Sequence, residues 1–284
     1  MNLYYSHKCL GYKRLRHPES PDRIASARDR LAADGWNFIE PTPCEKQDIL
    51  RVHVPFLYES VQNGTFTDPD TPVLPGILEH ALLSAGAAAQ ACESAVQGIP
   101  AFSLMRPPGH HATPNRVMGF CYFNNIAVAV SGFMKRNPGA SVAIVDIDCH
   151  HGNGTEDIFL GNPYVLFVSL HQNPCYPGTG LQSRENCYNI PLPPGTGESV
   201  YLSSLERAVD TIRAFNPTLV GVSAGFDTHK DDPITQFGLE TATYRKIAEI
   251  LAALQKPTFA VLEGGYGQRL PDCILEFLRG LSET

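Results

Sequence analysis

Apolar and polar positions follow two rhythms along this chain. Short runs that are apolar on both faces, such as SVAIVDID at 141–148, are typical of strands buried within a parallel sheet. Longer segments with apolar residues three or four positions apart are typical of amphipathic helices. Strands are predicted at 101–105, 141–148, 164–171, 218–227 and 258–266, and helices at 19–35, 77–97, 124–136, 154–161, 199–215 and 241–254.

These strands and helices alternate, and no linker, repeat or low-complexity segment divides them. Such alternation predicts a mostly parallel, multi-stranded sheet sandwiched by helices. A chain of 284 residues that is 43% hydrophobic can fill one large core. We therefore predict a single α/β domain over residues 1–284.

Charge and cysteine content narrow the class of protein. The formal net charge of -7 argues against direct binding to nucleic acid or to an anionic membrane, since such proteins are usually basic. The 8 cysteines form no CxxC pair, which favours reduced thiols over a disulfide framework. The N-terminal segment has no apolar signal-peptide core, and no apolar run is long enough to span a bilayer. These features predict a soluble, cytoplasmic protein.

Polar residues follow each of the predicted strands. The strand at 141–148 ends in two aspartates and a histidine, and comparable residues follow the others. The residues at these strand ends are Arg106, His110, His111, Asp146, Asp148, His150, Ser169, His171, Asp227 and Tyr266. Ligands of open parallel sheets bind at the carboxyl ends of the strands. We therefore expect these side chains to converge on one edge of the sheet and to form an active site there.

Asp146, Asp148 and His150 have the spacing of side chains that share one side of an extended segment. Asp227 adds a carboxylate from another strand. Two carboxylates and one imidazole, with a further position left for water, fit a catalytic zinc site. Buried like charges without a cation would each cost several kcal/mol. The spacing alone leaves open which of Asp146 and Asp148 binds the metal.

A second pair of adjacent histidines, in RPPGHHA at 106–112, completes a series of motifs. The other motifs are GFCYFNN (119–125), DIDCHHGNG (146–154), SLH (169–171), YPGTG (176–180), SAGFD (223–227) and EGGY (263–266). This series resembles the histone deacetylase family, which includes bacterial deacetylases, acetylpolyamine amidohydrolases and acetoin-utilization proteins. The resemblance extends over about residues 4–280, and the GNG and EGGY forms are similar to its class II branch. It implies an arginase/deacetylase-like fold and a zinc-dependent amide hydrolase.

The resemblance assigns metal ions to specific positions. It implies that zinc is bound by Asp148, His150 and Asp227, which makes the choice that the spacing left open. A structural potassium ion is implied at Asp146, Ser169 and Leu170, together with the backbone of Asp148 and His150. A second, weaker site for a monovalent cation is implied on the backbone of Phe159, Asn162 and Val165.

The resemblance also assigns catalytic roles. His111 is implied to be the general base, oriented by Asn153, and His110 is implied to remain charged beside Asp146. A neutral imidazole suits the transfer of a proton from water to the leaving amine. Tyr266 is implied to donate a hydrogen bond to the oxyanion opposite zinc. The loss of one such donor typically lowers turnover by ~100- to 1000-fold.

Residues that line the substrate tunnel are implied in the same way. Phe120 and Tyr176 would form its walls, and Gly119 would accept a hydrogen bond from the substrate amide. Most relatives that act on acetyl-lysine have phenylalanine where this chain has Tyr176. Asp70 resembles a rim aspartate that grips a peptide backbone, with an ordinary surface residue as the alternative. Arg23 resembles an arginine of an inner channel, with a structural salt bridge as the alternative.

Several substrates fit the resemblance. Acyl-lysine in a protein or peptide is favoured, because the polyamine-selective branch has a glutamate seven residues after the zinc-binding aspartate, where this chain has Ile234. Acetylated polyamines or other small amines are the alternative, and longer acyl groups are compatible with the sequence. A catalytically inactive acyl-binding relative is a remote alternative, because both histidine pairs and Tyr266 are present. An arginase-type ureohydrolase, which has a similar sheet, is a further alternative. It is disfavoured because it would need two bridged metals and a different Asp/His pattern. We expect a monomer or a homodimer.

Overall fold

One parallel sheet runs through the molecule. The computed structural model describes residues 1–282. Within them the strands are β1 (Asn2–Tyr4), β2 (Phe38–Ile39), β3 (Ala101–Ser103), β4 (Val142–Asp146), β5 (Val165–Gln172), β6 (Cys187–Leu192), β7 (Leu219–Ala224) and β8 (Thr258–Leu262). They form an 8-stranded sheet in the order β2-β1-β3-β8-β7-β4-β5-β6, and every neighbouring pair is parallel. The predicted parallel sheet is therefore confirmed.

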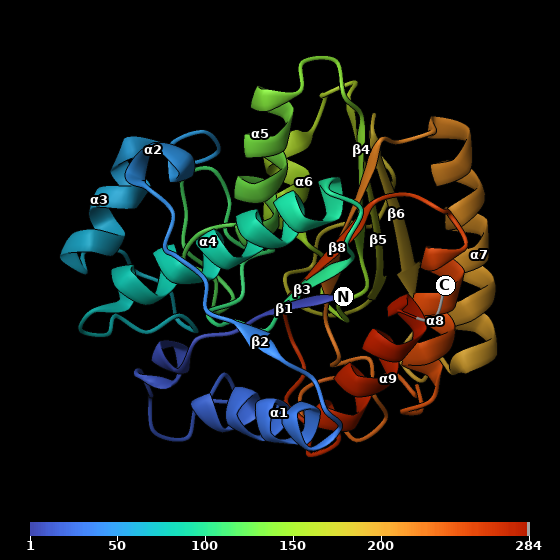
Figure 1. The fold of residues 1–284 in the computed structure, drawn as a ribbon, viewed down its shortest axis with the longest axis horizontal. Coiled ribbons are helices and arrows are strands. Elements are labelled where there is room, and N and C mark those ends of the chain that lie inside the picture. The colour runs from blue at the N-terminus through green and yellow to red at the C-terminus, as the bar shows by residue number, and fades with distance from the viewer. Residues whose placement is uncertain (283–284) are drawn as a thin grey trace.

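Helices cover both faces of this sheet (Figure 1). The helices are η1 (His7–Leu10), α1 (Pro21–Ala33), α2 (Lys46–Ile49), α3 (Pro55–Asn63), α4 (Ile77–Val96), α5 (Asn125–Arg136), α6 (Asn153–Phe159), α7 (Glu198–Phe215), α8 (Thr243–Ala252) and α9 (Leu270–Ser282). On one side α4 and α5 lie against the sheet, and α2, α3 and α6 pack beside them. On the other side α7, α8, α9 and α1 pack against one another in series.

The adjacent strands β8, β7, β4 and β5 are buried along their whole length. Because helices cover both of their faces, these strands are apolar on both sides, which is the pattern that revealed them in the sequence. The small residues of α4 allow this helix to pack closely against its neighbours. Gly86 lies against the backbone of Thr42 and Cys44, where a Cβ atom would collide with main-chain atoms. The helix can therefore approach the preceding loop closely.

Strands β3, β4, β7 and β8 end earlier than the sequence predicted, and most of the site residues lie in the loops that follow them. β4 ends at Asp146, β7 at Ala224 and β8 at Leu262. The carboxylates of Asp146 and Asp148 accept hydrogen bonds from the backbone N–H groups of Asp148 (3.1 Å) and His150 (2.8 Å). These local bonds compete with the strand ladder and turn the chain. The expectation of an extended segment here is therefore wrong.

Several elements were not predicted, namely β1, β2, β6, α2, α3 and α9. Strands β1 and β2 have only 3 and 2 residues, which is too short for a clear pattern. Strand β6 lies at one edge of the sheet and is only partly buried, so it lacks a continuous apolar run. Helix α9 does have apolar residues at helical spacing, and the prediction omitted it.

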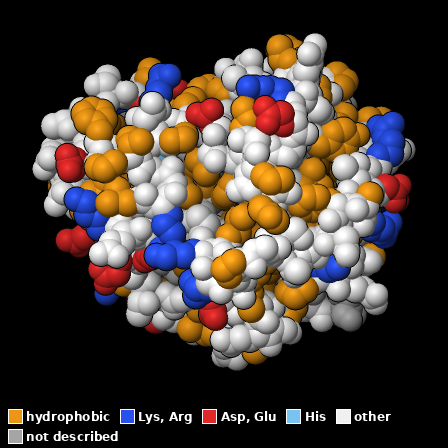
Figure 2. Space-filling model, turned by 90° about the horizontal axis from the view of Figure 1, so that it is seen from above, with side chains coloured by type: hydrophobic (Ala, Val, Ile, Leu, Met, Phe, Trp, Pro, Cys, Tyr) orange, Lys and Arg blue, Asp and Glu red, His pale blue; other side chains and the backbone are white. Residues whose placement is uncertain are grey.

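The face seen from above in Figure 2 is mixed in character. Lys and Arg side chains lie near Asp and Glu side chains there, and hydrophobic side chains lie between them.

No helix within residues 1–282 has both the length and the apolar character that are needed to cross a membrane.

Candidate active site

A cavity of about 240 Å³ lies at the carboxyl ends of the central strands. Its lining residues are Asp70, Pro108, His110, His111, Gly119, Phe120, His150, Tyr176, Ile234, Gly264 and Tyr266. The loops that follow β3, β4, β5, β7 and β8 all contribute to this lining. The polar residues at the predicted strand ends therefore do meet at one edge of the sheet.

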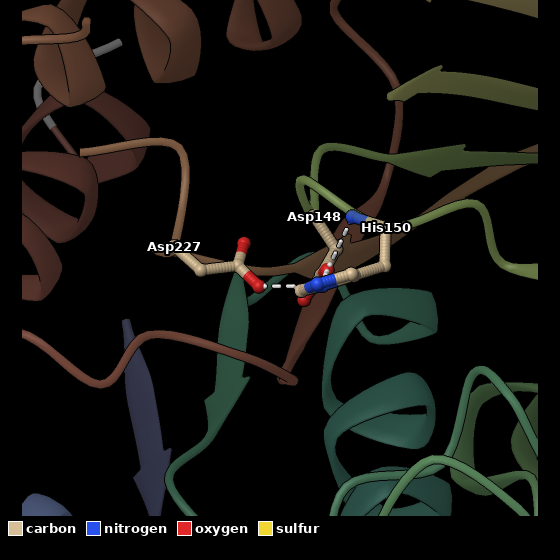
Figure 3. A group of neighbouring side chains, drawn as sticks. All are labelled: Asp148, His150 and Asp227. Carbon is tan, nitrogen blue, oxygen red and sulfur yellow. Dashed lines mark hydrogen bonds and ion pairs between the residues drawn. The ribbon is translucent and has the colours of Figure 1, made fainter. Parts of the chain in front are cut away.

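Two carboxylates and one imidazole form a tight group beside this cavity (Figure 3). The ligand atoms of Asp148, His150 and Asp227 all lie within 4.8 Å of one another. Nδ1 of His150 is 3.0 Å from Oδ1 of Asp148 and 2.9 Å from Oδ2 of Asp227. Oδ2 of Asp227 is buried, and among the described residues its polar contact is this ion pair with His150. Metal–ligand bonds of ~2.0 Å in a tetrahedral zinc site put ligand atoms ~3.3 Å apart, so these three residues fit such an ion.

Backbone amides orient the two carboxylates of this group. The N–H of Cys149 donates to Oδ1 of Asp227 (2.8 Å), and the N–H of Gly264 donates to Oδ2 of Asp148 (2.8 Å). A Cβ atom at Gly264 would collide with both carboxylates, so only glycine fits there. Burial, followed by the negative charge of Asp148, raises the pKa of Asp227. The group therefore holds like charges in a buried place, which a bound divalent cation would offset.

The adjacent histidines after β3 have different partners. Nδ1 of His110 is 2.9 Å from Oδ2 of Asp146, whereas Nδ1 of His111 is 2.8 Å from Oδ1 of Asn153. Burial opposes a charge on His110, but the carboxylate of Asp146 outweighs it and raises the pKa of His110 to about 10. Burial, together with the charge of His110, holds the pKa of His111 well below its usual value. At neutral pH His110 is thus cationic and His111 is neutral, with Nε2 free to accept a proton.

Tyr266 lines the cavity from the loop after β8. Its ring is half-buried, lies 5.9 Å from the ring of Phe120 in a perpendicular contact, and has the guanidinium of Arg23 4.6 Å above it. Its backbone N–H donates to Oδ2 of Asp232 (2.7 Å). Burial raises the pKa of Tyr266 well above its usual value, so the phenol keeps its proton and can donate a hydrogen bond.

Arg23 belongs to a buried network of charges beside the same loop. Its Nε and Nη2 atoms donate to the carbonyls of Gly265 (2.6 Å) and Glu263 (2.8 Å). Its Nη1 atom is 3.3 Å from Oε1 of Glu19, and Glu19 also pairs with Arg106 at 2.6 Å. Burial opposes the charge on Glu19, but Arg106 holds its pKa below the usual value. The sequence did not single out Glu19, because its partner Arg106 is 87 positions away.

Glu263 is another site residue, for which no role was predicted beyond its place in the EGGY motif. Its Oε2 atom accepts hydrogen bonds from the backbone N–H groups of Gly109 (2.7 Å) and His110 (3.1 Å). Ser223 donates to its Oε1 atom at 3.3 Å. The carboxyl group of Glu263 therefore ties the end of β8 to the loop that carries both histidines.

The residues expected in the tunnel walls surround the histidines. Gly119 has φ +58°, and a Cβ atom there would collide with the ring of His111. Phe120 also has a positive φ, of 70°, which is unusual for a bulky residue. Its N–H donates to Oγ1 of Thr71 at 2.8 Å, which helps to hold that conformation. The ring of Tyr176 lies 5.1 Å from the ring of His111 and perpendicular to it.

Two residues expected at the rim lie at the mouth of the cavity. Asp70 is exposed, and its backbone carbonyl accepts a hydrogen bond from Nε2 of His17 (2.9 Å). The ring of His17 in turn contacts the ring of Phe120 edge-on at 4.6 Å, so the rim loop is connected to the tunnel wall. Ile234 is 42% exposed, which makes it available for contact with a substrate.

Comparison with known proteins agrees with this geometry. The family model for the histone deacetylase domain matches residues 17–281. The chain belongs to the histone deacetylase family. A relative named probable deacetylase, from Archaeoglobus fulgidus, is 38% identical over 277 residues, which cover 88% of this chain and 76% of the relative.

Solved structures of the histone deacetylase family have the same fold. The crystal structure of the HDA15 HD domain gives a TM-score of 0.91 at 32% identity, with 99% of this chain and 88% of that chain covered. An acetylpolyamine aminohydrolase from Burkholderia pseudomallei gives a TM-score of 0.86 at 29% identity, with 99% of this chain and 98% of that chain covered. One of these two similar structures is therefore named for acetylated polyamines.

In this family member the residues expected around potassium lie next to one another. Asp146 and Ser169 are register partners in β4 and β5, and Leu170 follows Ser169. Asp146 is paired with His110, so it stands apart from the group that fits zinc. The hydroxyl of Ser169 is 2.9 Å from Nδ1 of His171. Carboxylate, hydroxyl and carbonyl oxygens are the donors that hard cations prefer.

The residues expected around a second monovalent cation have protein partners. Nδ2 of Asn186 donates to the carbonyls of Phe159 and Val165, at 2.9 Å in both cases. The carbonyl of Asn162 accepts a hydrogen bond from the N–H of Val165 (3.1 Å). Oδ1 of Asn186 accepts from the N–H of Gly161 (2.7 Å). This turn is therefore held by a side-chain amide, and the second cation site stays a prediction.

Proposed function

We propose that this chain is a zinc-dependent deacylase that hydrolyses the acetyl or acyl amide of lysine side chains in proteins or peptides. The observation that carries the proposal is the gathering of Asp148, His150, Asp227, the neutral His111 and Tyr266 around one cavity. The three ligands would hold zinc. Zinc in such a site acts as a Lewis acid on the acyl carbonyl and activates water at neutral pH.

The side chains around the cavity would then move one proton and stabilise one charge. Nε2 of His111 takes the proton of the attacking water, because Nδ1 is committed to Asn153, and later gives it to the leaving amine. His110 stays charged beside Asp146 and favours the anionic intermediate. The phenol of Tyr266 donates a hydrogen bond to the oxygen on which negative charge develops.

The walls and the mouth of the cavity favour a lysine side chain. Phe120 and Tyr176 offer aromatic surfaces to an aliphatic stem. Ile234 at the mouth offers no charge to a distal ammonium group of a polyamine. An acetylated small amine is the second candidate. It is supported by the acetylpolyamine aminohydrolase of similar fold, whose structure superposes on 99% of this chain.

We also propose that a structural potassium ion binds at Asp146, Ser169 and Leu170, with backbone carbonyls of Asp148 and His150. Support comes from the register pairing of Asp146 with Ser169 and from the oxygen donors that it brings together. The reaction is expected in the cytoplasm, on an acylated protein, peptide or small amine, without a direct role for nucleic acid or membrane.

The test is a comparison of substrates with metal-quantified protein. An acetyl-lysine peptide, acetylputrescine and acetylspermidine would be assayed side by side, with Tyr266→Phe as the control for chemistry. We expect kcat/KM to be at least about tenfold higher for the peptide than for either small amine, a difference of ~1.4 kcal/mol in transition-state binding. Tyr266→Phe should retain zinc and lose ~100- to 1000-fold in turnover.

A second variant tests the role of the mouth. Ile234→Glu adds a carboxylate at a partly exposed position, so it should raise kcat/KM for acetylspermidine while leaving the peptide less affected. A wild-type preference for the small amines would refute the lysine assignment. Full activity of Tyr266→Phe would refute the oxyanion role of Tyr266.

A further inference from the structure

We propose that Asp232 is a positioning residue that fixes the orientation of Tyr266 and couples it to the mouth of the cavity. This inference rests on the proposed function of the same site. Asp232 lies in the loop after β7 and is only 7% exposed. Its two carboxylate oxygens accept hydrogen bonds from two residues that line the cavity, Tyr266 and Ile234.

The two hydrogen bonds differ in what they can do. Oδ1 accepts from the N–H of Ile234, two positions along the chain, at 3.0 Å. This is a local turn of a kind that aspartate often forms. Oδ2 accepts from the N–H of Tyr266, 34 positions away, at 2.7 Å. Only the second bond links the loop after β7 to the loop after β8, and a local structural role would not require it.

The peptide group that precedes the Tyr266 side chain is held at both ends. Its N–H belongs to Tyr266 and donates to Asp232, while its carbonyl belongs to Gly265 and accepts from Nε of Arg23 at 2.6 Å. Both bonds involve a charged group, and such bonds are shorter and stronger than neutral ones. Together they fix the plane of this peptide, and hence the direction in which the Tyr266 side chain leaves the backbone.

The loop needs such a clamp because its own sequence is flexible. Gly264 and Gly265 precede Tyr266, and Gly267 follows it. Gly265 has φ +117°, a conformation that side chains other than glycine rarely adopt. Glycines give a loop many alternative conformations, so the phenol would not stay in place without outside contacts. Since an oxyanion donor must be preorganised to be effective, loosening it should lower turnover more than substrate binding.

The test is Asp232→Asn, with Asp231→Asn as the matched control. Asparagine keeps the size of the side chain, but it presents an NH₂ group to one of the two backbone N–H groups. Asp231 is adjacent and exposed, with 59% of its side chain accessible. With the acetylated substrate that the wild type turns over best, we expect Asp232→Asn to lower kcat at least tenfold, with KM within about twofold and zinc content unchanged. Asp231→Asn should match the wild type.

A double variant separates positioning from a general structural effect. If Asp232 acts through Tyr266, Asp232→Asn should cause little further loss in a Tyr266→Phe background, because the phenol is already absent. An equal loss in both backgrounds would overturn the inference while leaving the proposed function intact. A wild type that turns over no acetylated substrate would instead refute the proposed function.

Hydrogen exchange tests the clamp without any assay of activity. In Asp232→Asn the backbone amide of Tyr266 should exchange at least tenfold faster than in the wild type, while amides in β7 and β8 keep their protection. Unchanged exchange at Tyr266 would overturn the inference, whatever the enzyme activity. Faster exchange throughout the sheet would also overturn it, because it would reveal a general loss of stability.

Discussion

Two regions of this chain resemble cation sites in sequence, but their oxygen atoms have different partners in the structure. In the first region, Asp148 and Asp227 bring two carboxylates to a buried place beside His150. One of these oxygens, Oδ2 of Asp227, is buried in an ion pair with Nδ1 of His150. In the second region, around the turn after α6, Asn186 donates hydrogen bonds to the backbone carbonyls.

The difference shows what identifies a cation site. Two carboxylates that are buried beside a single imidazole are costly, and a bound divalent cation would offset that cost. A neutral carbonyl that already accepts a hydrogen bond carries no such cost. The NH₂ group of Asn186 already donates hydrogen bonds to the carbonyls of Phe159 and Val165.

Asp227→Asn should remove metal and activity together. The variant loses one of the anionic ligands, and the Lewis acid contributes several kcal/mol to catalysis, so turnover should fall by ~1000-fold, or about 4 kcal/mol. Metal content measured by mass spectrometry and kcat measured on the same samples would check this. Asp157→Asn is the control, because Asp157 is an exposed carboxylate near the site in sequence. Activity that survives without stoichiometric metal would contradict the first half of the contrast.

Removal of the metal should destabilise the wild type and leave Asp227→Asn unaffected. A ligand at ~100 times its Kd stabilises a protein by about 2.7 kcal/mol, so the wild-type Tm should fall by several degrees after chelation. In Asp227→Asn the Oδ1 atom can still accept from Cys149, and one of the two buried carboxylates beside His150 is replaced by a neutral group. Thermal unfolding with and without chelator measures both values. An equal fall in Tm in both proteins would show that the chelated metal lies elsewhere.

Asn186→Asp should convert the second region into a cation-dependent site. The carboxylate loses both donor N–H groups and faces the carbonyls of Phe159 and Val165, so stability should fall by ~1–3 kcal/mol in the absence of a suitable cation. Potassium or sodium should restore part of this loss. Tm would be followed against potassium chloride, with a bulky organic cation keeping the ionic strength constant.

Asn186→Ala is the control for this last experiment. It loses the same hydrogen bonds without gaining a charge, so its response to potassium should match that of the wild type. The comparison with the wild type also removes any contribution of a potassium ion at Asp146 and Ser169, which all three proteins share. If the Tm of the wild type rose with potassium and the Tm of Asn186→Ala did not, the second region would be a cation site.

The sequence by itself determined the sheet and the place of the site. Strands covered on both faces must be apolar on both sides, and this left the long runs of β4, β5, β7 and β8 easy to recognise. Charged residues at the ends of buried strands are costly to bury unless they bind a partner. Because ligands of parallel sheets bind at the carboxyl ends of the strands, these residues indicated one site at that edge of the sheet. The motifs then carried the resemblance to the histone deacetylase family, and the match to residues 17–281 confirmed it.

The folded chain shows which groups lie together, in agreement with the choice of Asp148 that the family resemblance implied. It brought Asp148, rather than Asp146, into the group with His150 and Asp227, because Asp146 is paired with His110. Spacing could not make that choice, since both aspartates have the same side-chain chemistry.

The supporting residues were decided in the same way. Asp232, Glu19 and Glu263 hold the loops around the site, and Asn186 holds the turn after α6. Nearly all of their partners are backbone groups or residues far along the chain. Every residue has a backbone carbonyl and nearly every residue has a backbone N–H. The amino-acid type of a residue therefore does not reveal that its backbone accepts or donates a particular hydrogen bond. Such contacts arise only when folding brings distant segments together.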